Sequence, residues 1–222
     1  TYTIGLTVPG IDNPFFATLA STVIENLKLA GYHTLLADSL ENQKDFESSL
    51  QMFRSRSVDG IIAVPVGNPS EMIDAITGSI PTVLIDRYYE DTNLPYICTD
   101  NYMGGYMATE YLIGRGYRNI LSIQGVEDST PSMERVRGFK DAIKAHSEKG
   151  VEYAIVGDAF SVENGYNQVK RIFSEGLKFD SVFAYSSTIL LGAIRAFREM
   201  GIQIPGQVGI ISFDNNGFLD FL

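Results

Sequence analysis

The sequence of 222 residues is poor in the side chains that hold metals and form cross-links. Cys98 is the single cysteine, so the chain has no partner for an internal disulfide, which suits the cytoplasm. His33 and His146 are the two histidines, which makes a His/Cys zinc site very unlikely. The histidine of a Ser-His-Asp catalytic site would have to be one of these two. We therefore expect neither a metal nor a cofactor, and no catalytic residue is assigned.

Basic residues are also scarce. Lys and Arg number 17 against 27 Asp and Glu, which gives a net charge of −10. A chain with this charge repels phosphate backbones, so we expect it to bind nucleic acid poorly by itself. No apolar run approaches the roughly 20 residues of a membrane span. We therefore expect no membrane partner.

Motifs of the common α/β enzymes are missing. The sequence has no G-x-x-x-x-G-K-[ST] phosphate loop and no G-x-S-x-G nucleophile elbow. Gly104-Gly105 and Gly114-x-Gly116 do not complete the dinucleotide fingerprint G-x-G-x-x-G. Nothing marks a catalytic pair among the carboxylates. The chain is therefore predicted not to be an enzyme.

Short β-branched runs alternate with longer amphipathic stretches along the whole chain. Strands are predicted at 2–8, 34–37, 60–64, 82–86, 119–124, 152–156, 181–184 and 209–213. Helices are predicted at 14–29, 42–55, 70–76, 102–113, 133–145, 162–173 and 189–200. Continuously apolar strands that alternate with helices are typical of buried parallel sheets. The pattern predicts an α/β protein with two doubly wound parallel-sheet lobes of about five strands each, at 1–100 and 101–222, and a ligand cleft between them.

Ligands of open parallel sheets bind beyond the carboxyl ends of the strands, so the residues that follow each strand are the candidate site. Aromatic, carboxylate, guanidinium and amide side chains stand there in both halves. Aromatic rings can cover the C–H faces of a sugar, and charged groups can bind its hydroxyls. The candidates are Asn13, Phe15, Phe16, Asp86, Arg87, Arg135, Phe160 and Asp214.

Each candidate also has a purely structural interpretation. Asn13 before Pro14 reads as a helix cap with proline in the first turn, and Phe160 as a core residue. Asp86-Arg87 reads as a surface ion pair. Arg135, in the first turn of its predicted helix, reads as a solvated charge, and Asp214 as a turn residue. The joint placement at strand ends favours the ligand-binding interpretation.

Motifs spread over nearly the whole chain resemble the effector-binding core of the LacI/GalR family of transcriptional regulators. More distantly, they are similar to the periplasmic ribose-type sugar-binding proteins. The matching segments are TIGLTVPGIDNPFFATLA, VDGIIAVP, IPTVLIDR, ERVRGF, GDAF followed by GY, and IPGQVGIISFDN. The resemblance implies the periplasmic-binding-protein-like fold, type I, with a ligand between two lobes.

In the first half, the resemblance implies that Asn13, Phe15 and Phe16 line the sugar site. Asp86 and Arg87 match a strand-end pair that bonds ring hydroxyls.

In the second half, Arg135 matches the arginine that grips the effector. Phe160 matches an aromatic that stacks on the ligand, and Asp214 a carboxylate that closes over sugar hydroxyls. Ser186-Ser187 departs from the family, which usually has Asn-Asp there. Ser186 remains a candidate, with a shorter side chain that lacks the amide.

Two further departures concern the ends. No helix-turn-helix or hinge helix precedes Thr1, and the family continues for several tens of residues beyond Leu222. We expect a truncated core that reaches operator DNA only through a domain not in this chain. The resemblance implies a cytoplasmic, homodimeric repressor whose DNA affinity changes when a small carbohydrate binds. The alternative is a secreted sugar-binding protein that feeds an ABC transporter.

Overall fold

The computed structural model of the protein describes residues 2–67, 73, 78, 80–89, 91–215 and 217. It divides into two compact units, Thr1–Thr99 and Asp100–Leu222, and each unit is described by itself. The predicted helix at 70–76 lies, apart from residue 73, outside the described residues.

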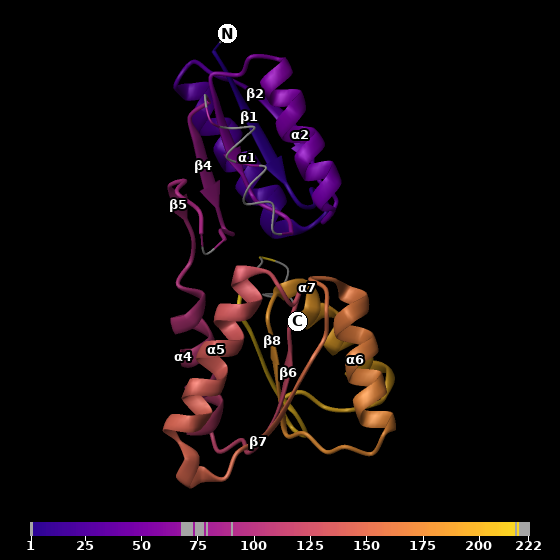
Figure 1. Ribbon diagram of the computed structural model, residues 1–222. Helices are drawn as coiled ribbons and strands as arrows, with labels where there is room; N and C mark the ends of the chain where they lie inside the picture. The colour runs from indigo at the N-terminus through magenta and orange to yellow at the C-terminus, as the bar shows by residue number, and fades with distance from the viewer. Residues whose placement is uncertain are drawn as a thin grey trace. The chain divides into compact units, whose positions relative to one another are not determined.

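The first unit is an α/β fold built on a parallel sheet (Figure 1). The strand order is β2-β1-β3-β4-β5, and every neighbouring pair is parallel. The elements are β1 (Thr3–Val8), α1 (Pro14–Leu29), β2 (His33–Asp38), α2 (Gln43–Ser55), β3 (Gly60–Ala63), β4 (Thr82–Ile85) and β5 (Tyr96–Ile97). The carboxyl ends of all these strands therefore share one edge of the sheet.

Two helices cover opposite faces of this sheet. Leu6 and Val8 of β1 pack with Phe16 of α1 in one buried cluster. Phe53 of α2 packs with Ile61 of β3 in another cluster. Because successive side chains of a strand point to opposite faces, the apolar runs of the sequence serve both helices.

The second unit is also α/β, with a parallel sheet in the order β7-β6-β8-β9. Its elements are α4 (Asn101–Gly114), β6 (Asn119–Ile123), α5 (Thr130–Ala145), the short helix η1 (Ser147–Lys149), β7 (Glu152–Val156), α6 (Val162–Ser174), β8 (Ser181–Ala184), α7 (Ser187–Glu199) and β9 (Gly209–Ser212). Figure 1 shows α4 and α5 on one face of this sheet and α6 and α7 on the other. One buried cluster contains residues of all four helices.

Glycines allow the paired helices to cross at backbone contact. A Cβ at Gly105 of α4 would collide with the backbone of Arg135 on α5. A Cβ at Gly138 of α5 would collide with the backbone of Tyr102 on α4. This close crossing brings Arg135 against the first turn of α4, which matters for the site.

The predicted fold class is confirmed, since each unit is a doubly wound α/β fold with a parallel sheet. Apart from shifts of one or two residues at the ends of other elements, three details differ from prediction. Strand β5 was missed because it is only two residues long. The described second sheet has four strands rather than about five. Helix α5 begins at Thr130 rather than 133, because Ser129 caps it and Pro131 lies in its first turn, so Arg135 is in the second turn.

No helix among the described residues is both long enough and apolar enough to cross a bilayer.

Candidate functional site

In the first unit, the residues after β1 form a rigid helix start. The Asn13 side chain accepts a hydrogen bond from the backbone N–H of Phe15 at 3.0 Å, and Pro14 opens the helix. This is the predicted N-cap, and it fixes where the two aromatic rings begin. The rings of Phe15 and Phe16 meet edge to face with their centroids 5.1 Å apart. Phe16 is buried in the core, whereas Phe15 is only partly buried.

Asp86 and Arg87 follow β4 at the same edge and are buried, so the surface ion-pair interpretation is wrong. Asp86 has a φ of +69°, a left-handed conformation that non-glycine residues rarely adopt. The Arg87 guanidinium lies 5.6 Å from the centre of the Phe16 ring. Arg87 Nε is 3.8 Å from a carboxylate oxygen of Asp86. The structure therefore brings Phe16, Asp86 and Arg87 together.

Sequence reasoning missed Glu41, which belongs to the loop between β2 and α2. Both of its carboxylate oxygens accept hydrogen bonds from Arg87, one from Nη1 at 2.8 Å and the other from Nη2 at 2.6 Å. The two residues are 46 positions apart, and no motif links them. The one available signal was that both residues follow strands of the same parallel sheet, whose carboxyl ends share an edge.

In the second unit, Arg135 is 5% exposed, so it is not a solvated charge. Its Nε donates to the side-chain oxygen of Asn101 at 2.9 Å, and Nη1 donates to the backbone carbonyl of Tyr185. Its guanidinium carbon lies 3.5 Å from the centre of the Phe213 ring. These three supporting residues were missed by sequence reasoning, because they come from α4 and from the ends of β8 and β9.

Asp214 follows β9 and is partly buried. Burial raises the pKa of its carboxyl group above the ordinary value, and the positive charge of Arg135 offsets part of that rise. Asp214 and Arg135 therefore interact electrostatically. Burial also raises the pKa of the Tyr185 hydroxyl, so this phenol is neutral at physiological pH.

Ser186 and Phe160 are linked through Thr188. The Thr188 hydroxyl donates to the backbone carbonyl of Phe160 at 3.2 Å, and it lies 2.9 Å from the Ser186 hydroxyl. A hydroxyl has one proton, so Ser186 must be the donor to Thr188. Ser186 also caps α7 by accepting from the N–H of Ile189.

The second unit also has an open hollow of about 680 Å³. Its lining residues are Gln124, Glu127, Asp128, Met133 and Val136. None of the four predicted residues of this unit is among these described lining residues.

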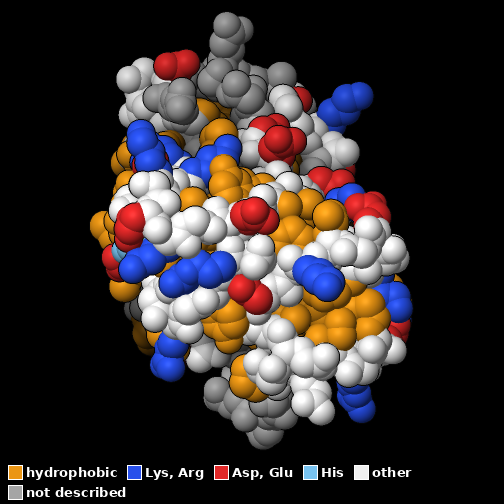
Figure 2. Space-filling view, turned by 90° about the horizontal axis from the view of Figure 1, so that it is seen from below, with side chains coloured by type: hydrophobic (Ala, Val, Ile, Leu, Met, Phe, Trp, Pro, Cys, Tyr) orange, Lys and Arg blue, Asp and Glu red, His pale blue; other side chains and the backbone are white. Residues whose placement is uncertain are grey.

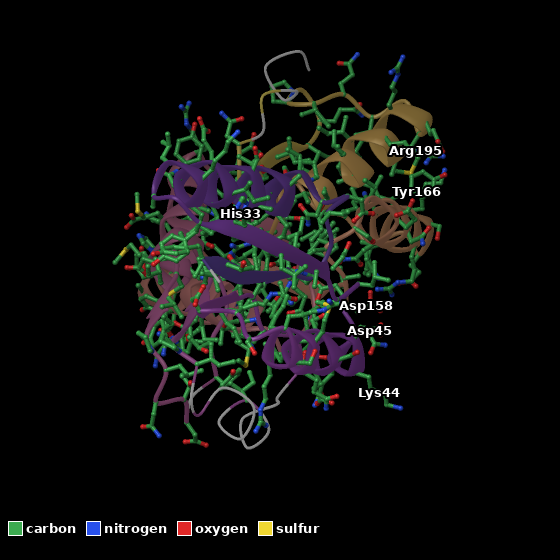
Figure 3. The ribbon with its side chains drawn as sticks, turned by 90° about the horizontal axis from the view of Figure 1, so that it is seen from above. His33, Lys44, Asp45, Asp158, Tyr166 and Arg195 are labelled. Carbon is green, nitrogen blue, oxygen red and sulfur yellow. The ribbon has the colours of Figure 1, made fainter. Side chains whose placement is uncertain are left out.

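Other titratable side chains lie outside the set of candidate residues. His33 is exposed at the amino end of β2, opposite the candidate edge (Figure 3). Tyr166 and Arg195, also labelled in Figure 3, stack across α6 and α7 at 4.7 Å. The carboxylate of Glu199 accepts from the Tyr166 hydroxyl, which raises the tyrosine pKa. Among the described residues, no group of three or more His, Cys, Asp or Glu is placed to hold a metal ion. At both edges, guanidinium, carboxylate and aromatic groups lie close to one another.

The surface is of mixed charge on the face drawn in Figure 2, where Lys and Arg alternate with Asp and Glu around hydrophobic side chains. The described part of that face carries no basic stripe of the kind that follows a phosphate backbone.

Comparison with known proteins identifies what the chain resembles. Residues 1–221 match the family described as periplasmic binding proteins and sugar binding domain of LacI family. The ribose operon repressor of Halalkalibacterium halodurans is 31% identical over 95% of this chain and 62% of the relative. The repressor PurR of Pasteurella multocida is 30% identical over 97% of this chain and 65% of the relative. The chain thus spans less than two thirds of these curated relatives.

Solved structures of LacI-family proteins are also similar to this chain. A periplasmic binding protein/LacI transcriptional regulator from Alkaliphilus metalliredigens, complexed with D-xylulofuranose, is 32% identical with a TM-score of 0.87. It covers 100% of this chain and 81% of that one. A putative LacI-family transcription repressor from Corynebacterium glutamicum, 27% identical, has a TM-score of 0.86, with 100% and 81% covered.

Proposed function

The chain belongs to the family of periplasmic binding proteins and LacI-type sugar-binding domains, and we propose that it is the effector-binding part of a transcriptional repressor. Its curated relatives include a ribose operon repressor and the transcriptional repressor PurR. These relatives support a regulator over the transport protein that the sequence left open.

The observation that carries the proposal is the pair of carboxyl edges. Each has a buried arginine against an aromatic ring and a nearby carboxylate: Arg87 with Phe16 and Asp86, and Arg135 with Phe213 and Asp214. Such groups donate to and accept from hydroxyls, while rings cover C–H faces.

We assign residues 1–100 and 101–222 as the two effector-binding lobes. The proposed ligand residues are Asn13, Phe15, Phe16, Asp86, Arg87, Arg135, Phe160, Ser186 and Asp214. The ligand is a small carbohydrate, as in the neighbour complexed with D-xylulofuranose.

In this proposal the protein is cytoplasmic, forms a homodimer and catalyses no reaction. Effector binding changes an equilibrium between conformations, and DNA is contacted by a domain outside this chain. Such coupling between sites typically amounts to about 1–3 kcal/mol.

A thermal-shift screen with pentoses, hexoses, disaccharides, sugar phosphates and purines tests the proposal. A ligand at 100 times its Kd adds about 2.7 kcal/mol to the stability of the folded state. For a protein of this size that is a rise of roughly 5–11 °C in Tm. We expect at least one sugar to produce it. A chain that melts cooperatively but responds to no sugar would contradict the assignment.

A further inference from the structure

The ion pair between Arg87 and Glu41 joins a buried guanidinium to a solvent-exposed glutamate through two hydrogen bonds. Arg87 is 4% exposed, and the Glu41 side chain is 34% exposed. The two parallel hydrogen bonds use both terminal nitrogens of the guanidinium and both oxygens of the carboxylate. This two-pronged arrangement occupies the face of an arginine that would otherwise bind a phosphate.

Glu41 is held in place by a strained loop. Leu40 and Glu41 have φ values of +49° and +52°, although neither is glycine. The loop is fixed by hydrogen bonds from the Leu40 N–H to the Asp38 carboxylate at 3.0 Å and from the Glu41 N–H to the carbonyl of Pro9 at 2.9 Å. Residues in this region of backbone space persist where the surrounding structure imposes them, and they gather at functional sites.

The topology places the pair across the candidate edge. Glu41 follows β2 and Arg87 follows β4, and β1 and β3 lie between these strands in the sheet. The pair therefore spans the carboxyl ends of β1 and β3, near the Phe16 ring.

Among the described residues at this edge, carboxylates outnumber cations. Four carboxylates, those of Asp12, Asp38, Glu41 and Asp86, belong to strands that end here or to the loops that follow them, and the cation in these positions is Arg87. The first turn of α2 adds one charge of each sign, Lys44 and Asp45, both exposed (Figure 3). A phosphate at this edge would have to displace Glu41 and would meet the remaining carboxylates. A sugar hydroxyl can instead donate to them.

We propose that Glu41 is a specificity-determining residue, which neutralises and positions Arg87 so that the site accepts an uncharged sugar and rejects its phosphorylated form. This inference rests on the proposed sugar-binding function and names the ligand class of the same site.

Glu41→Gln tests it, because the variant keeps the length of the side chain and an acceptor oxygen but loses the charge. Glu47→Gln on α2 is the matched control, since Glu47 bonds Gln43 and the charge change is the same. Each neutral sugar that raises the Tm is compared with its monophosphate by calorimetry. Inorganic phosphate serves as a probe that does not depend on the identity of the sugar.

We expect the parent and Glu47→Gln to bind the neutral sugar at least about tenfold more tightly than the monophosphate. In Glu41→Gln this preference should shrink by about tenfold or more, and inorganic phosphate should raise the Tm of this variant alone. Glu41→Asp keeps the charge and should keep the preference, which separates charge from packing if Glu41→Gln folds poorly.

The inference is overturned if the parent prefers the monophosphate, or if Glu41→Gln and Glu47→Gln show the same preference. Failure of every sugar and sugar phosphate to bind the parent contradicts the proposed function instead.

Discussion

Arg135→Ala is the substitution that most directly probes the second unit. It removes a buried guanidinium that bonds Asn101 and the Tyr185 carbonyl and stacks on Phe213. Hydrogen bonds from a charged donor contribute about 1.5–3 kcal/mol each, and a cation over a ring adds about 0.5–2 kcal/mol. Part of this gain is offset by the cost of burying the charge. We expect the free energy of unfolding to fall by about 3–5 kcal/mol.

Urea denaturation followed by far-ultraviolet circular dichroism measures this loss. Arg137→Ala is the matched control, two positions along the same helix. The Arg137 side chain is 60% exposed and pairs with Glu134 at 2.6 Å. An exposed pair contributes about 0–1 kcal/mol, so this variant should stay close to the parent.

Ligand affinity provides the second measurement. Under the proposed function, Arg135→Ala should cost about 2–5 kcal/mol of binding free energy. Arg135→Lys keeps the charge but not the planar fork, so we expect an intermediate loss. If Arg135→Ala unfolded at the same urea concentration as Arg137→Ala, the buried network would be wrong. If it bound the sugar as tightly as the parent, the site assignment would be wrong.

Two other substitutions test the surroundings of this arginine. Burial raises the pKa of Asp214, so the folded state binds the carboxyl proton more tightly than the unfolded chain does. The stability that this group contributes is therefore present below about pH 3.8 and is lost as the pH rises through the folded pKa. Asp214→Asn should therefore be more stable than the parent at pH 7, and the gain should vanish near pH 3 in thermal melts. An equal gain at both pH values would contradict this explanation. Gly138→Ala places a methyl group against the Tyr102 backbone and should cost about 1–3 kcal/mol in urea denaturation. In the control Gly114→Ala, the added Cβ has no atom within 4 Å, so the stability of this variant should be unchanged or slightly higher than that of the parent. Equal effects of Gly138→Ala and Gly114→Ala on stability would refute the close helix crossing.

The local periodicity of the sequence determined most of the fold. Apolar strands between amphipathic helices predicted the parallel sheets, and the cap at Asn13 before Pro14 predicted the exact start of α1. The predicted start of the helix that carries Arg135 was three residues too late. Its true first turn begins Thr130-Pro131-Ser132, where two small polar side chains flank a proline and break the apolar pattern on which the prediction relied.

The candidate site was predicted only in part, because its sequence signal is positional. Strand ends are visible in a sequence, so Asp86, Arg87 and Asp214 could be named as candidates. The burial of both arginines could not be predicted, since it depends on which helices cross and how closely. Gly105 and Gly138 read as ordinary helix glycines until their contacts are known.

The sequence by itself determined most of the elements, their order and the residues at the ends of the predicted strands, because these follow from local periodicity and capping. Only the tertiary structure decided the partners of the charges. Glu41 reaches Arg87 across two intervening strands, and Asn101, Tyr185 and Phe213 gather around Arg135 from three separate elements. Such contacts depend on the strand order and the closeness of helix packing, which no local pattern in the chain encodes.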